Sequence, residues 1–95
     1  MVEFIKVDGK DIGDIKIYAL STCGWCKKAK RFFNERKIAY AYVDVDLLSS
    51  DDLSAVKGEQ AKFNPNTSYP TIVVNGEKVI IGFNEPRLMN LVGEV

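Results

Sequence analysis

The sequence contains no histidine and only two cysteines, Cys23 and Cys26, among its 95 residues. Without histidine, Cys–His and Ser–His catalysis within the chain and any histidine-ligated metal site are excluded. Lysine plus arginine and aspartate plus glutamate each number 13, so the formal net charge is zero. Because there is neither a basic surplus nor an acidic tail, we expect no nucleic-acid partner.

Long hydrophobic runs are also missing. No apolar stretch is long enough to span a bilayer, and residues 1–6 lack the basic and apolar regions of a signal peptide. We therefore expect a cytoplasmic protein without membrane contact. Thiols are kept reduced there, and a cysteine pair is more often catalytic or metal-binding than structural. With 46% hydrophobic and 27% charged residues, the composition is that of one ordinary globular domain.

Hydrophobic periodicity and turn residues predict the element order β-α-β-α-β-β-α. The expected strands are 15–20, 39–45, 71–74 and 78–81, and the expected helices are 24–36, 49–63 and 84–93. A single crossover helix makes the first two strands parallel, and Asn75-Gly76 is typical of a type I′ hairpin. These elements form a predicted domain over 15–95. Residues 1–14 are interpreted as an N-terminal extension in which Phe4, Ile5 and Val7 add a short edge strand.

The cysteines form a Cys-x-x-Cys motif that follows a predicted strand and opens a predicted helix. Such a pair beside a βαβ pattern is typical of a dithiol–disulfide redox centre. The unpaired N–H groups and the positive dipole end of the helix favour a thiolate at Cys23, and Lys27 and Lys28 add positive potential. Cys26 follows about one turn later. We therefore predict an exposed attacking Cys23 and a more buried resolving Cys26.

Other interpretations of these residues stay open. The cysteines are also compatible with small core residues, with half of a zinc site shared by two chains, or with a redox-inert interaction domain. Trp25 is either part of a binding surface or an aromatic that only shields the sulfurs. The basic residues of the first helix are interpreted as a solvated face rather than a docking surface: Lys27, Lys28, Lys30 and Arg31.

From Ile15 to Val95 the sequence resembles the glutaredoxins of the thioredoxin-fold superfamily. The matching residues are Ile17-Tyr18, Thr22 to Cys26, Lys28 to Lys30, Val43 to Asp46, Tyr69-Pro70, Asn75-Gly76 and Gly82 to Glu85. The resemblance implies an α/β, three-layer thioredoxin-like fold with a four-stranded mixed sheet flanked by three helices. It also implies that Cys23 is the nucleophile and Cys26 the resolving thiol. A cis bond before Pro70 would turn the Tyr69 backbone toward an extended substrate.

The resemblance also implies a surface for glutathione or another thiol-bearing substrate. Its residues would be Thr22, Trp25, Lys27, Tyr69, Pro70, Gly82, Phe83, Asn84 and Glu85. The sequence departs from the family at this surface. Gly24-Trp25 replaces the usual Pro-Tyr, Leu20 stands in place of a glutathione-binding lysine, and Ile81-Gly82 keeps one of two paired glycines. These departures favour weaker glutathione binding.

Taken together, these residues predict a monomeric thiol–disulfide oxidoreductase without metal or tightly bound cofactor. Its expected substrates are protein disulfides or glutathione mixed disulfides. The resemblance implies that either glutathione, as co-substrate, or a thioredoxin-reductase-type flavoprotein would supply the electrons. The alternative is a [2Fe–2S] cluster carrier, in which Cys23 from two chains and two glutathione thiols would ligate the cluster. Gly24 favours this alternative, whereas Cys26 and the weakened glutathione surface oppose it.

Overall fold

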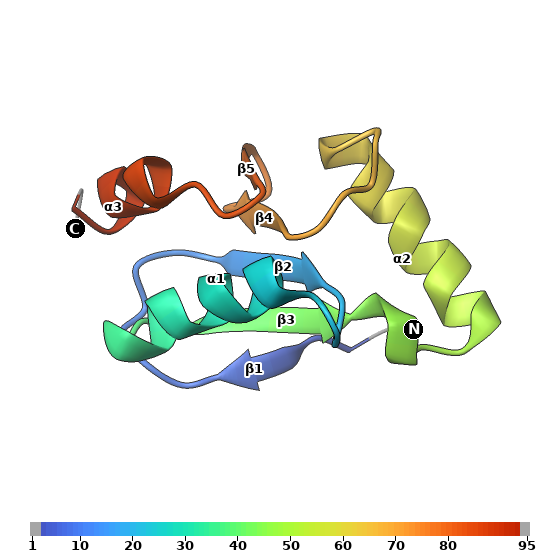
Figure 1. Ribbon diagram of the computed structural model, residues 1–95, viewed down its shortest axis with the longest axis horizontal. Coiled ribbons are helices and arrows are strands. Elements are labelled where there is room, and N and C mark those ends of the chain that lie inside the picture. Colours follow the sequence, from blue (N-terminus) through green and yellow to red (C-terminus); the bar gives the residue numbers. More distant parts are fainter. Residues whose placement is uncertain (1–2, 94–95) are drawn as a thin grey trace.

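The computed structural model describes residues 3–93, which form a five-stranded mixed sheet with three helices (Figure 1). The ends of the predicted extension and domain, 1–2 and 94–95, lie outside the described residues. The strands are β1 (Ile5–Val7), β2 (Ile15–Ala19), β3 (Tyr40–Asp44), β4 (Thr71–Val74) and β5 (Lys78–Ile81). They lie in the order β1-β3-β2-β4-β5. As predicted, β2 and β3 are parallel, whereas the other neighbouring pairs are antiparallel.

The sheet has five strands where the resemblance implied four, because β1, in the segment where a short edge strand was predicted, pairs with β3 at the edge, with Lys6 opposite Ala41. The following chain stays on this edge: the Lys10 N–H donates to the Lys37 carbonyl (2.8 Å), and the Lys10 carbonyl accepts from Ala39 (2.9 Å). Gly9 permits this approach, because a Cβ there would lie 2.6 Å from the Ala39 nitrogen.

The side chains of β2 alternate between two apolar clusters, one on each face of the sheet. Ile15, Ile17 and Ala19 enter the larger cluster, and Tyr18 enters the smaller one. Helices α1 (Gly24–Glu35) and α3 (Glu85–Gly93) pack on the larger cluster, whereas α2 (Ser50–Phe63) packs on the smaller one. Figure 1 shows α1 lying across β2 and β3. The fold therefore has the three layers that the resemblance implied.

Local capping explains where the helices begin and end. The Ser49 hydroxyl accepts from the Asp52 N–H (3.3 Å), so α2 begins at Ser50. The first helix ends at Glu35, one residue before its predicted end, because Arg36 is its cap and Lys37 adopts a left-handed φ of 54°. A short 3₁₀ helix, η1 (Val45–Leu47), follows β3 directly and shortens the predicted strand.

Candidate active site: a cysteine pair at a helix N-terminus

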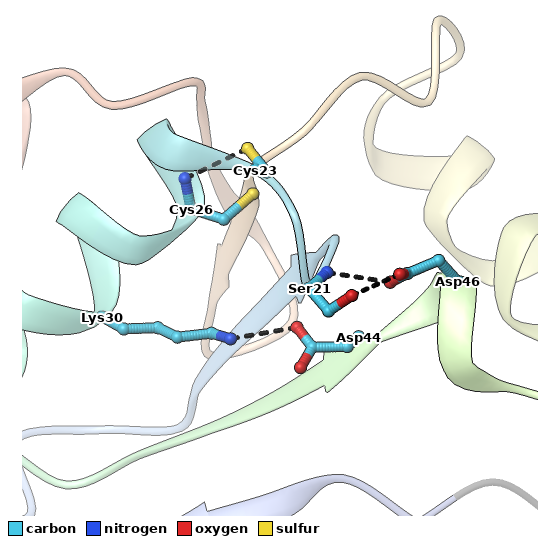
Figure 2. Close-up of polar contacts among 6 residues, drawn as sticks. All are labelled: Ser21, Cys23, Cys26, Lys30, Asp44 and Asp46. Atoms are coloured by element: carbon cyan, nitrogen blue, oxygen red, sulfur yellow. Dashed lines mark hydrogen bonds and ion pairs between the residues drawn. The ribbon is translucent and has the colours of Figure 1, made fainter.

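The carboxyl ends of the parallel strands β2 and β3 lie at the same end of the sheet. Two polar links meet there: one starts from the loop after β2 and the other from α1 (Figure 2). The first link fixes the loop that carries the first cysteine. The Ser21 N–H donates to Asp46 Oδ1 (2.8 Å), and the Ser21 hydroxyl donates to Oδ2. These hydrogen bonds lower the pKa of the Asp46 carboxyl. The loop before Cys23 is thereby attached to the end of β3.

Cys23 is the N-cap residue of α1, with extended backbone angles of φ −84° and ψ 117°. The backbone N–H of Cys26 donates to Cys23 Sγ across 3.2 Å, as Figure 2 shows. The cysteine sulfur therefore takes the place of the oxygen that usually caps a helix. An N–H group and a helix N-terminus aimed at this half-buried sulfur stabilise negative charge on it.

Cys26 has the opposite environment, because its side chain is fully buried in the larger apolar cluster. Burial, together with a hydrogen bond to Cys23, raises the pKa of the Cys26 thiol to about 12. Two weaker effects act in the other direction, a backbone hydrogen bond at Leu20 and the positive charge of Lys30. At neutral pH Cys26 is therefore a protonated thiol within hydrogen-bond reach of Cys23.

The second polar link lies one turn beyond Cys26. Lys30 Nζ, from α1, contacts Asp44 Oδ1 at the end of β3 across 2.9 Å, and it lies 4.0 Å from the centre of the Tyr42 ring. Both side chains of the ion pair are less than one-fifth exposed. The interpretation of Lys30 as part of a solvated face is therefore wrong. Its spacing of four residues from Cys26 places it on the same helix side as the buried cysteine.

The loop before β4 contains the cis Tyr69–Pro70 peptide bond that the resemblance implied. Its shape depends on a buried polar network from the end of α2. The amides of Gln60 and Asn64 donate to Thr71 Oγ1 (3.2 and 3.0 Å), which itself donates to the Ser68 carbonyl (2.7 Å). All three network side chains are at most 1% exposed. Sequence reasoning missed them, because isolated polar residues near a helix end give no periodic signal.

Tyr69 is half-buried and packs against both apolar clusters. Burial raises the pKa of its hydroxyl, and the neighbouring Cys26 and Asp46 raise it further. The ring packs against the same apolar cluster as Cys23 and Cys26. Within residues 3–93 the buried hydroxyl has no hydrogen-bond partner. The Pro70 carbonyl accepts from the Gly82 N–H (2.8 Å), and Gly82 has a left-handed φ of 76°.

The other predicted surface residues fall into two groups. Trp25 is 57% exposed and stacks on Phe83, with ring centres 6.2 Å apart, while Lys28 Nζ lies 4.4 Å from the Trp25 ring. Thr22, Lys27 and Glu85 are exposed. Asn84 is engaged elsewhere, because its side-chain oxygen accepts from the Arg87 N–H (3.2 Å) at the start of α3. In the structure Trp25 and Phe83 are therefore in contact, whereas the side chain of Asn84 is hydrogen-bonded to the backbone of α3.

Among the residues that the structure describes, no three His, Cys, Asp or Glu side chains gather to hold a metal ion. None of the helices described is long and apolar enough to cross a bilayer.

A Cys-x-x-Cys pair at a helix N-terminus and a cis-proline loop, on a mixed sheet with helices on both faces, define a protein of the thioredoxin-like class. The glutaredoxin family model matches residues 15–79, and the chain belongs to the glutaredoxin family. This result confirms the resemblance drawn from the sequence.

Solved structures and one known sequence support the assignment. Methanoredoxin of Methanosarcina acetivorans is 41% identical over 90% of each chain, with a TM-score of 0.86. A glutaredoxin from Methanosarcina mazei Go1 is 37% identical over 97% of this chain and 89% of that chain, also with a TM-score of 0.86. An uncharacterized glutaredoxin-like 8.6 kDa protein in the rubredoxin operon of Clostridium pasteurianum is 32% identical over 78 residues. The match covers 82% of this chain and 96% of that protein.

Proposed function

We propose that this protein is a thiol–disulfide oxidoreductase that reduces protein disulfides or glutathione mixed disulfides through Cys23 and Cys26. One observation carries the proposal. The sulfur of Cys23 caps α1 and accepts the Cys26 N–H, while the Cys26 thiol is buried within reach of it. A nucleophile accessible to substrate and a sheltered second thiol are the two parts of a dithiol exchange centre.

The reaction proceeds in two exchange steps. The Cys23 thiolate attacks one sulfur of the substrate disulfide, forms a mixed disulfide with it, and releases the other substrate sulfur as a thiolate, which takes up a proton. Cys26 then loses its proton and attacks Cys23 Sγ, which releases the second substrate thiol and forms a Cys23–Cys26 disulfide. The substrate gains two electrons from the protein and two protons, one from Cys26 and one from solvent, and the protein is left with a disulfide.

The protein disulfide is returned to the dithiol by an external reductant, for which we propose glutathione or a thioredoxin-reductase-type flavoprotein. Three features of the structure bear on this choice. Leu20 is half-buried against the smaller apolar cluster, Ile81 is 54% exposed, and Asn84 is occupied at the start of α3. Leu20 and Ile81 have no polar group to contact a glutathione carboxylate, and the hydrogen bond at the start of α3 uses the Oδ1 of Asn84. We place the reaction in the cytoplasm, where both reductants are maintained.

Comparing the two reductants tests the proposal. Oxidised protein is supplied with glutathione and glutathione reductase, or with a thioredoxin-type reductase, and NADPH consumption is followed on a small disulfide substrate. Turnover with either system supports the proposed oxidoreductase and identifies its electron source. Turnover only with the flavoprotein would mean that the departures at Leu20 and Ile81 have removed the glutathione route. Absence of turnover with both systems would contradict the proposed function.

The resolving step should accelerate as the pH rises. Burial raises the pKa of Cys26, so between pH 7 and 9 its thiolate fraction is small and grows about tenfold per pH unit. In the mixed disulfide Cys23 no longer has a thiol that can raise the pKa of Cys26, but burial still raises it. Stopped-flow release of thionitrobenzoate from its mixed disulfide with Cys23 measures this step, and Cys26→Ser provides the blank. A rate independent of pH in this range would show that thiol ionisation does not limit resolution.

A further inference from the structure

A groove of about 330 Å³ lies between α1 and the segment that leads into α3. Its α1 wall includes Lys28, Arg31 and Glu35, which share one helix side at spacings of three and four residues. Arg36 at the end of the helix also lines the groove, and Phe83 and Glu85 contribute from the segment at the start of α3. The groove is therefore lined by three cations and two carboxylates.

Within the described residues, none of the three cations has a carboxylate within 4.0 Å. Among residues 3–93 the ion pairs within 4.0 Å involve Lys16 and Lys30, neither of which lines the groove. Arg36 instead donates to the Phe32 carbonyl (3.2 Å) and stacks on the Phe32 ring at 3.7 Å. Residues 24–36 contain five lysines and arginines and one glutamate, a net charge of +4. Because the chain is neutral, its other residues together carry −4.

The groove begins beside the cysteine site. Lys28 and Phe83, which line it, both contact Trp25, and Trp25 stands between the two cysteines in the sequence. Along the helix, Arg31 lies eight residues beyond Cys23, a distance of about 12 Å at the helical rise. An extended polypeptide covers this distance in about four residues. Because the side chains add reach at both ends, a polypeptide linked to Cys23 can thus place side chains from about three residues away into the groove.

We propose that this groove binds acidic side chains of a protein substrate, located about three to six residues from the cysteine that Cys23 attacks. The inference rests on the proposed function and adds a substrate class to it. Glutathione does not fit this role, because it has only one residue on each side of its cysteine and reaches about 7 Å at most. Opposite charge at such a groove accelerates encounter and selects partners.

The test compares two peptides in full-length Cys26→Ser protein, which stops at the mixed disulfide. Each peptide carries one cysteine linked to thionitrobenzoate, with either glutamate or glutamine three, four and six residues away on both sides. Cys23 attacks the peptide sulfur and releases the chromophore, because thionitrobenzoate is the better leaving group. At low salt we expect the glutamate peptide to react about tenfold faster than the glutamine peptide.

Charge reversal shows whether the groove causes this preference. Arg31→Glu should reduce the ratio of the two rates to about one. Lys57→Glu is the matched control, because it makes the same change of charge on α2, against the other sheet face, and should leave the ratio unchanged. The mixed disulfide of glutathione with thionitrobenzoate is the short control substrate. Its reaction rate shows whether Arg31→Glu slows only the longer acidic peptide.

Three outcomes would overturn the inference. Equal rates for both peptides, an equal effect of Lys57→Glu, or equal slowing of the glutathione disulfide would each show that the groove does not select acidic polypeptides. In all three cases Cys23 still reacts, so the proposed function stands. If Cys23 released thionitrobenzoate from no disulfide, the proposed function and the inference would both fail.

Discussion

Replacing Cys23 by serine should abolish disulfide exchange, with a loss of turnover on the order of 10³-fold or more. A serine hydroxyl is not ionised at neutral pH and cannot form the mixed disulfide. The fold should nevertheless persist, because serine is a preferred N-cap residue and its oxygen can accept the Cys26 N–H as the sulfur does. NADPH-coupled turnover with the reductant that serves the wild-type protein measures the loss.

Cys23→Ala is the matched control that separates chemistry from capping. It should be equally inactive, but it should also lose about 1 kcal/mol of unfolding free energy relative to Cys23→Ser, because alanine offers no acceptor to the helix N-terminus. Urea denaturation compares the two variants. Wild-type turnover in Cys23→Ser would show that this sulfur is not the nucleophile. Equal stability of the two variants would show that capping at this position contributes little.

Local patterns in the sequence were sufficient to predict where the cysteines lie. The alternating apolar residues of β2, the motif and the amphipathic α1 follow one another without interruption, so the N-terminal position of Cys23 follows from local signals. The parallel pairing of β2 with β3 follows from the crossover rule. Family resemblance supplied the cis Tyr69–Pro70 bond, which residue patterns alone do not distinguish from a trans bond.

The polar links behind the cysteines were not predicted, because they depend on the register of strands far apart in the sequence. Ser21 and Asp46 are 25 residues apart, and Lys30 and Asp44 are 14 apart. The available signal was the position of the two aspartates, Asp44 as the last residue of β3 and Asp46 in η1 just after it, because the carboxyl end of β3 adjoins that of β2. The groove beside Phe83 was missed for a similar reason, because α3 meets α1 only in the folded chain.

Replacing Cys26 by serine should convert the protein from a two-cysteine to a one-cysteine enzyme. The Cys23 mixed disulfide with a protein substrate then has no internal thiol to resolve it, so it should accumulate, and turnover on protein disulfides should fall on the order of 10²-fold. Turnover of glutathione mixed disulfides through added glutathione should remain, because glutathione itself can resolve the Cys23–glutathione bond. Non-reducing electrophoresis and intact-protein mass measurement detect the trapped species.

Cys26→Ala makes this experiment independent of folding. Cys26 is fully buried in the larger apolar cluster, so serine places an added hydroxyl there at a cost of about 1–3 kcal/mol, whereas alanine keeps the site apolar. Both variants should trap the same mixed disulfide, and in both the trapped bond should form through Cys23. If a variant that folds released reduced protein substrate at the wild-type rate, resolution of the mixed disulfide would not require Cys26. The dithiol route would then be wrong, and an external thiol would resolve the mixed disulfide instead.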